Sequence, residues 1–223
     1  MPPSTATALR PLAILGGTFD PVHLGHLRVA WEAAEQLGAE VRLLPANQPP
    51  HRPPPVASAA QRVAMLRVAL AGQDRLTLDL REIERAGPSW TVDTLIALRR
   101  EIGPLRPLVL LIGADAYEGL TSWHRWRTLF ELAHIGVLTR PGPSTPLPPE
   151  LEFETAPRRA HEPAVLHGAP GGRVLAIAVT ALAISATRVR ALLATGHLPR
   201  FLVADALLAD PELLAPYRSG PIG

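Results

Sequence analysis

The hydrophobic positions of the chain fall into two patterns that alternate along it. Short apolar runs, typical of buried strands, occupy residues 11–15, 41–44, 76–80, 107–112, 134–138 and 173–179. Helical spacings of apolar residues predict helices over residues 24–37, 58–71 and 185–194, with one more that ends near residue 102. Because strands that alternate with helices form parallel sheets, we predict an α/β fold with a doubly wound, mostly parallel sheet.

The helix predicted over residues 24–37 shows the helical pattern clearly. Its apolar side chains recur on one face at Leu27, Ala30, Trp31, Ala34 and Leu37. Gly38 follows as a C-terminal stop. With the apolar runs on either side, this helix completes a strand, helix and strand joined by a right-handed crossover, which begins a doubly wound sheet.

The length and composition indicate one globular domain. The chain has 223 residues, of which 47% are hydrophobic and 19% charged, so it is long enough to bury a substantial core. We therefore predict a single domain over residues 1–223. The proline-rich residues 142–172 are predicted to form an irregular connection with at most one short helix, and residues 199–223 a helical tail.

Charge and cysteine content exclude several classes of function. All 22 basic residues are arginine, and 20 acidic residues nearly balance them, leaving a net charge of +2. Neither this balance nor the 4% aromatic content favours a nucleic-acid partner. The absence of cysteine excludes disulfides, cysteine-bound zinc and thiol catalysis.

No segment of the sequence predicts contact with a membrane. Residues 1–10 lack a charged leader followed by a long apolar core. The longest uncharged stretch, residues 174–187, is too short to span a bilayer core of about 30 Å. We therefore expect a cytoplasmic protein without a membrane partner.

A glycine turn is predicted between the first strand and the first helix. Gly16 and Gly17 end the strand and the helix begins at Leu24. Such a turn lets a phosphate approach the unpaired N–H groups at the helix start. His23 and His26 stand at the same place and can donate hydrogen bonds to phosphate oxygens. An ordinary turn and half of a metal site remain alternative interpretations.

The whole string Gly16-Gly-Thr-Phe-Asp-Pro-Val-His-Leu-Gly-His26 is far more specific than a glycine turn. It resembles the signature of the nucleotidyltransferase superfamily that carries the His-x-Gly-His motif. Ile184-Ser-Ala-Thr-Arg-Val-Arg190 resembles that superfamily's second signature, with Ala186 where the family has serine. The intervening motifs are most similar to those of the bacterial nicotinate-nucleotide adenylyltransferases, and the resemblance covers nearly the whole chain.

The resemblance implies a Rossmann-like nucleotidyltransferase fold and an adenylyl transfer in NAD biosynthesis. The phosphate of nicotinate mononucleotide would attack the α-phosphorus of ATP, giving deamido-NAD and pyrophosphate. Such a reaction requires positioning and charge stabilisation rather than a protein nucleophile. The implied catalytic residues are His23, His26 and Arg190, and the implied cofactor is a Mg²⁺ ion held mainly by the ATP phosphates, with no protein ligands of its own.

The implied ATP-binding residues are Gly17, Thr18, Phe19, His23, His26, Gly113, Asp115, Ser185, Thr187 and Arg190. Ser185 and Thr187 start a helix that carries Arg190 one turn later, an arrangement typical of a second anion cradle, although a serine there can be only a helix cap. Asp115 leaves the strand at 107–112 and can accept ribose hydroxyls, or it can cap the next short helix.

The implied residues for nicotinate mononucleotide are Asn47, His51, Arg52, Thr91, Trp123, His124 and Arg140. The first three lie in the stiff, proline-rich residues 45–55, which can also be a simple connector. Ser89 or Thr91 can equally cap the helix that follows. Two tryptophans three positions apart on a helix usually lie in the core, and we expect this of Trp126. By the resemblance Trp123 stacks on the pyridine ring, while Trp90 replaces the family's tyrosine.

Three alternative functions remain at this point. The chain can be another adenylyltransferase of the superfamily, with nicotinamide mononucleotide or phosphopantetheine as acceptor. It can also be a nucleotide-sensing module without catalysis, although His26 and Arg190 argue against this. A nucleic-acid binder is the weakest alternative. The oligomeric state is open.

Overall fold

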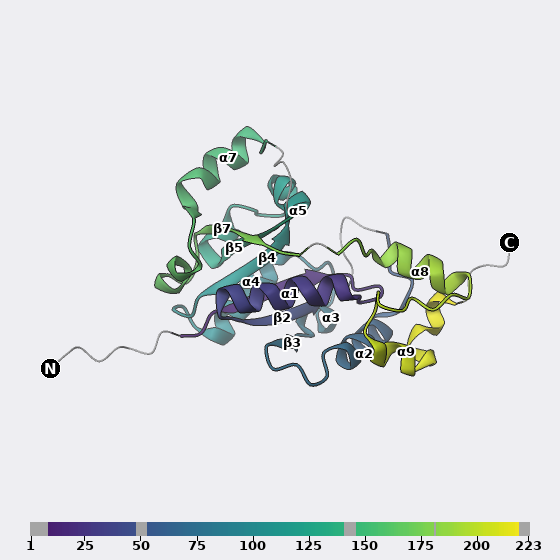
Figure 1. Ribbon diagram of the computed structural model, residues 1–223. Coiled ribbons are helices and arrows are strands. Elements are labelled where there is room, and N and C mark those ends of the chain that lie inside the picture. The colour runs from purple at the N-terminus through teal and green to yellow at the C-terminus, as the bar shows by residue number, and fades with distance from the viewer. Residues whose placement is uncertain (1–8, 48–52, 141–145, 181, 219–223) are drawn as a thin grey trace. The chain divides into compact units, whose positions relative to one another are not determined.

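The computed structural model describes residues 9–47, 53–140, 146–180 and 182–218. Within these ranges one sheet contains the strands β1 (Leu12–Gly17), β2 (Glu40–Pro45), β3 (Leu76–Leu78), β4 (Leu108–Gly113), β5 (His134–Thr139), β6 (Arg159–Ala160) and β7 (Val174–Ala178). The helices are α1 (Leu24–Leu37), α2 (Ala59–Ala69), α3 (Arg81–Glu84), α4 (Thr91–Ile102), α5 (Ala114–Glu118), α6 (Thr128–Leu132), α7 (Pro149–Thr155), α8 (Ala186–Ala194) and α9 (Asp205–Ala209). Figure 1 shows their arrangement along the chain.

The order in which successive strands are added to the sheet reverses between β1 and β4. Its strand order is β3-β2-β1-β4-β5-β7-β6. The pairs from β1 through β4, β5 and β7 to β6 are parallel, with Leu12 opposite Leu108 and Gly113 opposite Leu138. This reversal is the switch point of a doubly wound sheet, where ligands meet the carboxyl ends of the strands. The predicted doubly wound, mostly parallel sheet is confirmed.

The chain divides into two compact units. One comprises Met1–Leu15, Ala33–Val41 and Trp90–Val179, and the other comprises Gly16–Glu32, Arg42–Ser89 and Thr180–Gly223. β1, β2 and α1 contribute residues to both. The single domain over residues 1–223 stays a prediction.

The first unit is built on β4, β5 and β7, which lie side by side (Figure 1). Gly136 in β5 shows how closely this core packs. A Cβ atom there would come within 2.8 Å of Leu111 and 2.9 Å of Ile177. Only glycine leaves room for both side chains, and these two apolar residues are buried in turn.

The segment between β5 and β7 is more ordered than predicted. In place of an irregular connection, its described part contains α7, β6 and two 3₁₀ helices, η2 (Ala156–Arg158) and η3 (Pro163–Gly168). Leu166 is 1% exposed. The Nε2 atom of buried His134 lies 3.0 Å from the carbonyl oxygen of Leu166 and 2.9 Å from the carbonyl oxygen of Ala169. Long-range contacts of this kind leave no local periodicity, so the sequence prediction was wrong here.

The second unit contains α2, which begins as predicted at Ser58. The Ser58 side chain accepts from the Gln61 backbone N–H, and the Gln61 side chain accepts from the Ser58 backbone N–H. This reciprocal pair is a capping box, which fixes the helix start. A four-residue helix, α3, follows β3 and was not predicted.

The predicted C-terminal tail is helical only from Asp205. Residues 199–204 form turns, and α9 and the 3₁₀ helix η4 (Pro211–Tyr217) follow. Leu207 and Leu214 are fully buried, and Tyr217 is 3% exposed. These side chains are covered because α9 packs against α2, and η4 packs against α2 and α8. The yellow C-terminal segment in Figure 1 lies beside these helices.

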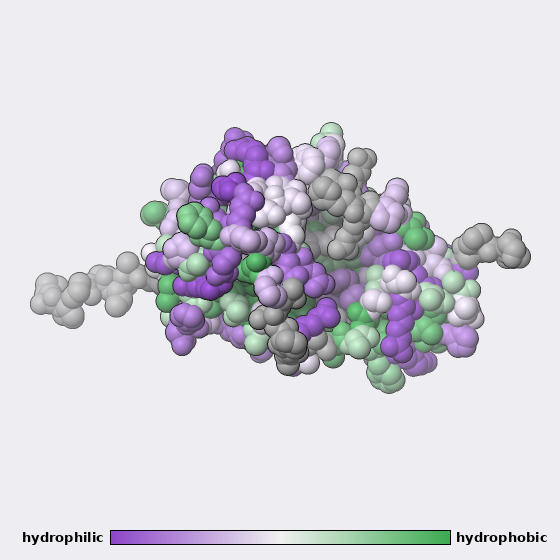
Figure 2. Space-filling model, turned by 90° about the horizontal axis from the view of Figure 1, so that it is seen from above, coloured by the Kyte–Doolittle hydropathy of each residue, from purple (hydrophilic) through white to green (hydrophobic). Residues whose placement is uncertain are grey.

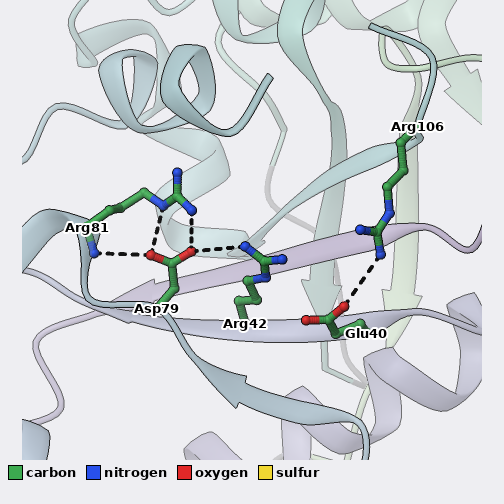
Figure 3. Close-up of polar contacts among 5 residues, drawn as sticks. All are labelled: Glu40, Arg42, Asp79, Arg81 and Arg106. Atoms are coloured by element: carbon green, nitrogen blue, oxygen red, sulfur yellow. Dashed lines mark hydrogen bonds and ion pairs between the residues drawn. The ribbon is translucent and has the colours of Figure 1, made fainter. Parts of the chain in front are cut away.

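A buried carboxylate organises the polar contacts beside β3 (Figure 3). Asp79 accepts hydrogen bonds from Arg81 at 2.8 Å and 2.6 Å and from Arg42 at 3.4 Å. Burial alone raises the pKa of Asp79, but the bonds from Arg81 and Arg42 outweigh it and lower the pKa below its usual value. Figure 3 also shows the ion pair in the first unit between Arg106 and Glu40, 3.5 Å long.

The surface does not by itself identify a partner. On the face shown in Figure 2 hydrophilic and hydrophobic residues are interspersed, and singly exposed apolar side chains are usual in proteins. Among the described residues, no helix combines the length and apolar character that crossing a bilayer requires.

Candidate functional site

The glycine turn that the sequence predicts lies between β1 and α1, in the second unit. Gly17 ends β1, and a Cβ atom there would lie 3.0 Å from the ring of Phe19. Phe19 has a left-handed backbone with a φ of 51° and is 2% exposed. Its side chain therefore supports the turn from within.

The two histidines of the motif lie face to face at the start of α1. The ring centroids of His23 and His26 are 3.6 Å apart, with an angle of 20° between the rings. The backbone N–H of His23 donates to Nδ1 of His26 over 3.3 Å. Because a ring nitrogen that accepts carries no proton, neutral His26 carries its proton on Nε2. The turn thus fixes His26 as a donor through Nε2.

His23 is the more enclosed of the two. It is 6% exposed, and its Nδ1 is buried without a hydrogen-bond partner among the described residues. Burial lowers the pKa of His23 to about 4, because the charged ring loses its solvation. His23 is therefore neutral at pH 7 and has one N–H donor. A proton on Nδ1 would be an unpaired buried donor, which favours the tautomer with the proton on Nε2.

Gly25, between the two histidines, is required for space. A Cβ atom there would lie 3.0 Å from both Cε1 and Nδ1 of His23. The His23 ring cannot easily give way, because it stacks on His26. His26 in turn meets the edge of Phe19, with 5.0 Å between ring centroids. A side chain at position 25 would therefore disturb the whole stack.

The second signature lies against the first within the same unit. Nη1 of Arg190 donates to the backbone carbonyl of Asp20 over 2.7 Å, although 170 positions separate them. Its Nη2 lies 3.4 Å from the Thr187 hydroxyl. The Ser185 side chain accepts from the Arg188 N–H, so Ser185 is the N-cap of α8. A hydroxyl that accepts can still donate, so the cap leaves the predicted anion contact possible.

Asp20 is the centre of this region, although the sequence predicted no role for it. It is 6% exposed. Its Oδ2 accepts from the backbone N–H of Val56 at 2.8 Å, and its Oδ1 accepts from that of Ala57 at 3.0 Å and from the Tyr217 hydroxyl at 2.7 Å. Membership of the motif was the only sequence signal, because all three partners are distant in the chain.

A second arginine missed by the sequence analysis supports the turn. Arg62 of α2 is 1% exposed, and its Nη1 donates to the Thr18 carbonyl over 2.7 Å. Burial lowers the pKa of Arg62, and the negative charge of Asp20 partly opposes this effect. Two guanidinium groups, those of Arg62 and Arg190, thus hold backbone carbonyls of the turn, and the single negative charge of Asp20 lies close to both.

The first residue predicted for the mononucleotide is anchored by the same unit. The backbone N–H of Asn47 donates to the Ser89 hydroxyl over 3.2 Å, and its side-chain nitrogen donates to the Arg85 carbonyl over 3.4 Å. The predictions for His51 and Arg52 lie outside the described residues. Asn47 thus holds the beginning of the proline-rich stretch in place.

Gly113, Asp115 and Arg140 lie at neighbouring strand ends in the first unit. Gly113 ends β4 opposite Leu138 of β5, and all three site residues are exposed. The alternative that Asp115 caps a helix is wrong. α5 begins directly after Gly113 and includes Asp115, with no side-chain cap. The exposed carboxylate is therefore not committed to capping.

The start of α4 also lacks the predicted cap. Trp90 occupies the cap position, but its side chain makes no hydrogen bond that caps the helix. The Ser89 hydroxyl instead accepts from the backbone N–H of Asn47. Thr91 is the first residue of the helix and is half-buried. The cap alternative is therefore wrong for both Ser89 and Thr91. The Trp90 ring instead meets that of His124, with 5.1 Å between centroids and a tilt of 41°.

Trp123 and Trp126 have different environments, and neither lies on a long helix as their spacing suggested. Trp123 follows the 3₁₀ helix η1 (Leu120–Ser122) with an extended backbone and is half-buried. Trp126 is 7% exposed and meets Phe130 edge-on, with 6.2 Å between centroids. The core position predicted for Trp126 is confirmed, and the half-buried Trp123 keeps part of its ring accessible.

The described side chains do not fit a metal ion by themselves. No group of three or more histidine, aspartate or glutamate residues gathers anywhere in the described ranges. Asp20, the carboxylate of the histidine motif, is already occupied by three donors. A metal ion at this turn would need ligands from a bound molecule.

Comparison with known proteins places these features in a family. Residues 14–192 match the cytidylyltransferase-like family. A protein of Dechloromonas aromatica named "Probable nicotinate-nucleotide adenylyltransferase" is 49% identical over 94% of this chain and 98% of its own length. One of the same name from Pseudomonas putida (strain W619) is 48% identical over 97% and 99%. The structure of Plasmodium falciparum nicotinic acid mononucleotide adenylyltransferase complexed with NaAD has the same fold, with a TM-score of 0.64, 14% identity and coverage of 90% and 95%.

Proposed function

Because the chain belongs to the cytidylyltransferase-like family and, within it, to the nicotinate-nucleotide adenylyltransferases, we propose that it transfers the adenylyl group of ATP to nicotinate mononucleotide. The products are deamido-NAD and pyrophosphate, and the reaction is a step of NAD biosynthesis. The observation that supports the proposal most directly is the junction of the two signatures, where Arg190 binds the turn that carries His23 and His26.

The chemistry is a direct displacement. A phosphate oxygen of nicotinate mononucleotide bonds to the α-phosphorus of ATP as the bond from that phosphorus to the bridging oxygen breaks, and pyrophosphate leaves. Negative charge moves onto the phosphate oxygens in the transition state. His26 donates through Nε2, neutral His23 donates through its one N–H, and Arg190 supplies a full positive charge. Fixed donors of this kind stabilise that charge without reorganisation.

The other residues that we propose for ATP belong partly to the second unit and partly to the first. Gly17, Thr18 and Phe19 offer backbone groups, and Ser185 and Thr187 offer hydroxyls beside the phosphates. The first unit offers Gly113 and the exposed Asp115 at the end of β4. A carboxylate at a strand end can accept both hydroxyls of a ribose.

The acceptor is recognised by groups of two kinds. Thr91 and the backbone near Trp123 and His124 supply donors for the pyridine carboxylate, and the accessible part of the Trp123 ring supplies a stacking surface. Arg140, exposed after β5, is suited to the mononucleotide phosphate. Asn47, His51 and Arg52 complete the acceptor contacts.

The expected cofactor is Mg²⁺, and it enters with ATP. Mg²⁺ prefers oxygen ligands and commonly binds through substrate phosphates and water. When bound, the ion neutralises part of the triphosphate charge, while the residues of this chain orient the reacting phosphates.

The test is pyrophosphate release from ATP with a panel of acceptors. We expect turnover with nicotinate mononucleotide, less with nicotinamide mononucleotide and none with phosphopantetheine. Faster turnover with either of the last two acceptors would show that nicotinate mononucleotide is not the preferred acceptor, while the reaction would still be adenylyl transfer. ATP binding without release with any of the three would indicate a sensing module and refute the proposal.

A kinetic measurement tests the direct displacement. With no protein nucleophile, initial rates should show a ternary complex rather than a ping-pong pattern. Labelled adenylate trapped on the protein after incubation with ATP alone would refute this mechanism.

A further inference from the structure

The side chain of Tyr217, in the C-terminal segment, contacts the turn between β1 and α1. Tyr217 is the last residue of η4 and is 3% exposed. η4 packs against α2 and α8, the helices that carry Arg62 and Arg190. The Tyr217 hydroxyl donates to Oδ1 of Asp20 over 2.7 Å, across 197 positions of sequence. Tyr217 lies outside both signatures, residues 16–26 and 184–190.

Asp20 meets Arg190 through both its backbone and its side chain. Nη1 of Arg190 lies 2.7 Å from the Asp20 carbonyl oxygen and 3.9 Å from Oδ2 of the carboxylate. One nitrogen of the guanidinium is thus held by both groups. A change in the orientation of Asp20 therefore changes the position of the charge on Arg190.

The Tyr217 hydroxyl stays protonated and therefore remains a hydrogen-bond donor to Asp20. Burial raises the pKa of Tyr217, and the hydrogen bond to Asp20 and the negative charge of Asp20 raise it further. The hydroxyl therefore keeps its proton throughout the working pH range. A hydrogen bond from a neutral donor to a carboxylate is stronger than one between neutral groups.

We propose that Tyr217 is a positioning residue for adenylyl transfer, which fixes the Asp20 carboxylate and through it the guanidinium of Arg190. The inference rests on the proposed function, because Arg190 acts there on the transferred phosphate. The backbone N–H groups of Val56 and Ala57 still hold Asp20 when the hydroxyl is removed. The loss should therefore loosen Arg190 without unfolding the turn.

The test compares the two tyrosines of the chain. Tyr217→Phe removes the hydroxyl and keeps the ring. Tyr117→Phe is the matched control, because Tyr117 is also buried, at 7% exposure, and its hydroxyl hydrogen-bonds with Thr155 in the first unit. Both variants should lose similar thermal stability. Only Tyr217→Phe should lower kcat, by about 3- to 10-fold, with both KM values within about 2-fold of wild type.

A double-mutant cycle tests whether the effect passes through Arg190. In an Arg190→Lys background, adding Tyr217→Phe should lower kcat by less than about 2-fold, because the positioned guanidinium is already gone. An unchanged kcat in Tyr217→Phe would show a purely structural role. An equal loss in both backgrounds would show a route that bypasses Arg190, and either result overturns the inference. A wild-type protein that releases no pyrophosphate with nicotinate mononucleotide would overturn the proposed function and this inference together.

Discussion

The histidine turn of the second unit and the aromatic region of the first unit differ in how firmly the chain itself holds them. In the turn, His23 is buried and its ring stacks on that of His26. The backbone N–H of His23 donates a hydrogen bond to Nδ1 of His26, which fixes the His26 ring. In the aromatic region the Trp90 ring meets an exposed His124 at a tilt of 41°, and Trp123 is half-buried. The groups that we propose to meet charge in the transition state are thus held in advance, whereas those that we propose to meet the substrate ring are held less firmly.

The strongest way to test this difference is to remove the fixed donor. His26→Ala deletes the Nε2–H that the turn orients, so we expect kcat to fall by about 10²-fold or more. Pyrophosphate release measures the effect, and circular dichroism should show an unchanged fold. Wild-type turnover in a folded His26→Ala protein would contradict the assignment of His26.

The aromatic region of the first unit should control the choice between the acid and amide forms of the mononucleotide. Donors that face both oxygens of the pyridine carboxylate meet an NH₂ group when the amide is bound, at a cost of about 1–3 kcal/mol. We expect nicotinate mononucleotide to have a kcat/KM roughly 10- to 100-fold above that of nicotinamide mononucleotide. Thr91→Ala should reduce the ratio of the two kcat/KM values. Trp123→Ala should lower kcat/KM for both substrates by similar factors, because stacking does not distinguish the acid from the amide. Equal or better use of the amide by wild type would refute the carboxylate pocket.

The same two regions show what the sequence can predict. α1 was predicted with its observed ends, because its apolar residues recur at helical spacing along the sequence. The motif pointed to His23 and His26, but the roles of Asp20, Arg62 and Tyr217 depend on contacts across tens to hundreds of positions. The stacking of Trp123 was predicted from the resemblance. The local prediction of a cap at Ser89 or Thr91 failed at the start of α4, where tertiary contacts replaced the expected cap.

The space around the histidine stack can be tested at Gly25. Gly25→Ala places a Cβ atom 3.0 Å from two atoms of the stacked His23 ring, and overpacking of this kind costs about 1–3 kcal/mol. We expect kcat to fall about 10- to 30-fold as the two donors are displaced. Gly168→Ala is the control, because nothing lies within 4 Å of a Cβ atom there. Equal activity of both variants would show that the stack can shift without loss.

The smallest expected effect concerns the pH dependence of stability that burial of His23 creates. The pKa of His23 is lowered from 6.5 to about 4 in the folded protein. Between these values the unfolded chain binds a proton that the folded protein does not, so the free energy of unfolding falls as the pH falls from 6.5 towards 4. Above pH 6.5 His23 is neutral in both states, and its contribution is constant.

His23→Gln removes this titration and leaves all other groups in place. Buried His134, whose pKa burial also lowers, is common to both proteins and cancels in the comparison. Urea unfolding of the ligand-free proteins at pH 7 and pH 5.5 should show that wild type loses about 1 kcal/mol more than His23→Gln. Parallel losses in the two proteins would mean that His23 is protonated in the folded state at pH 5.5. The turn would then present a charged imidazolium to the phosphates, and the proposed single neutral donor at this position would be wrong.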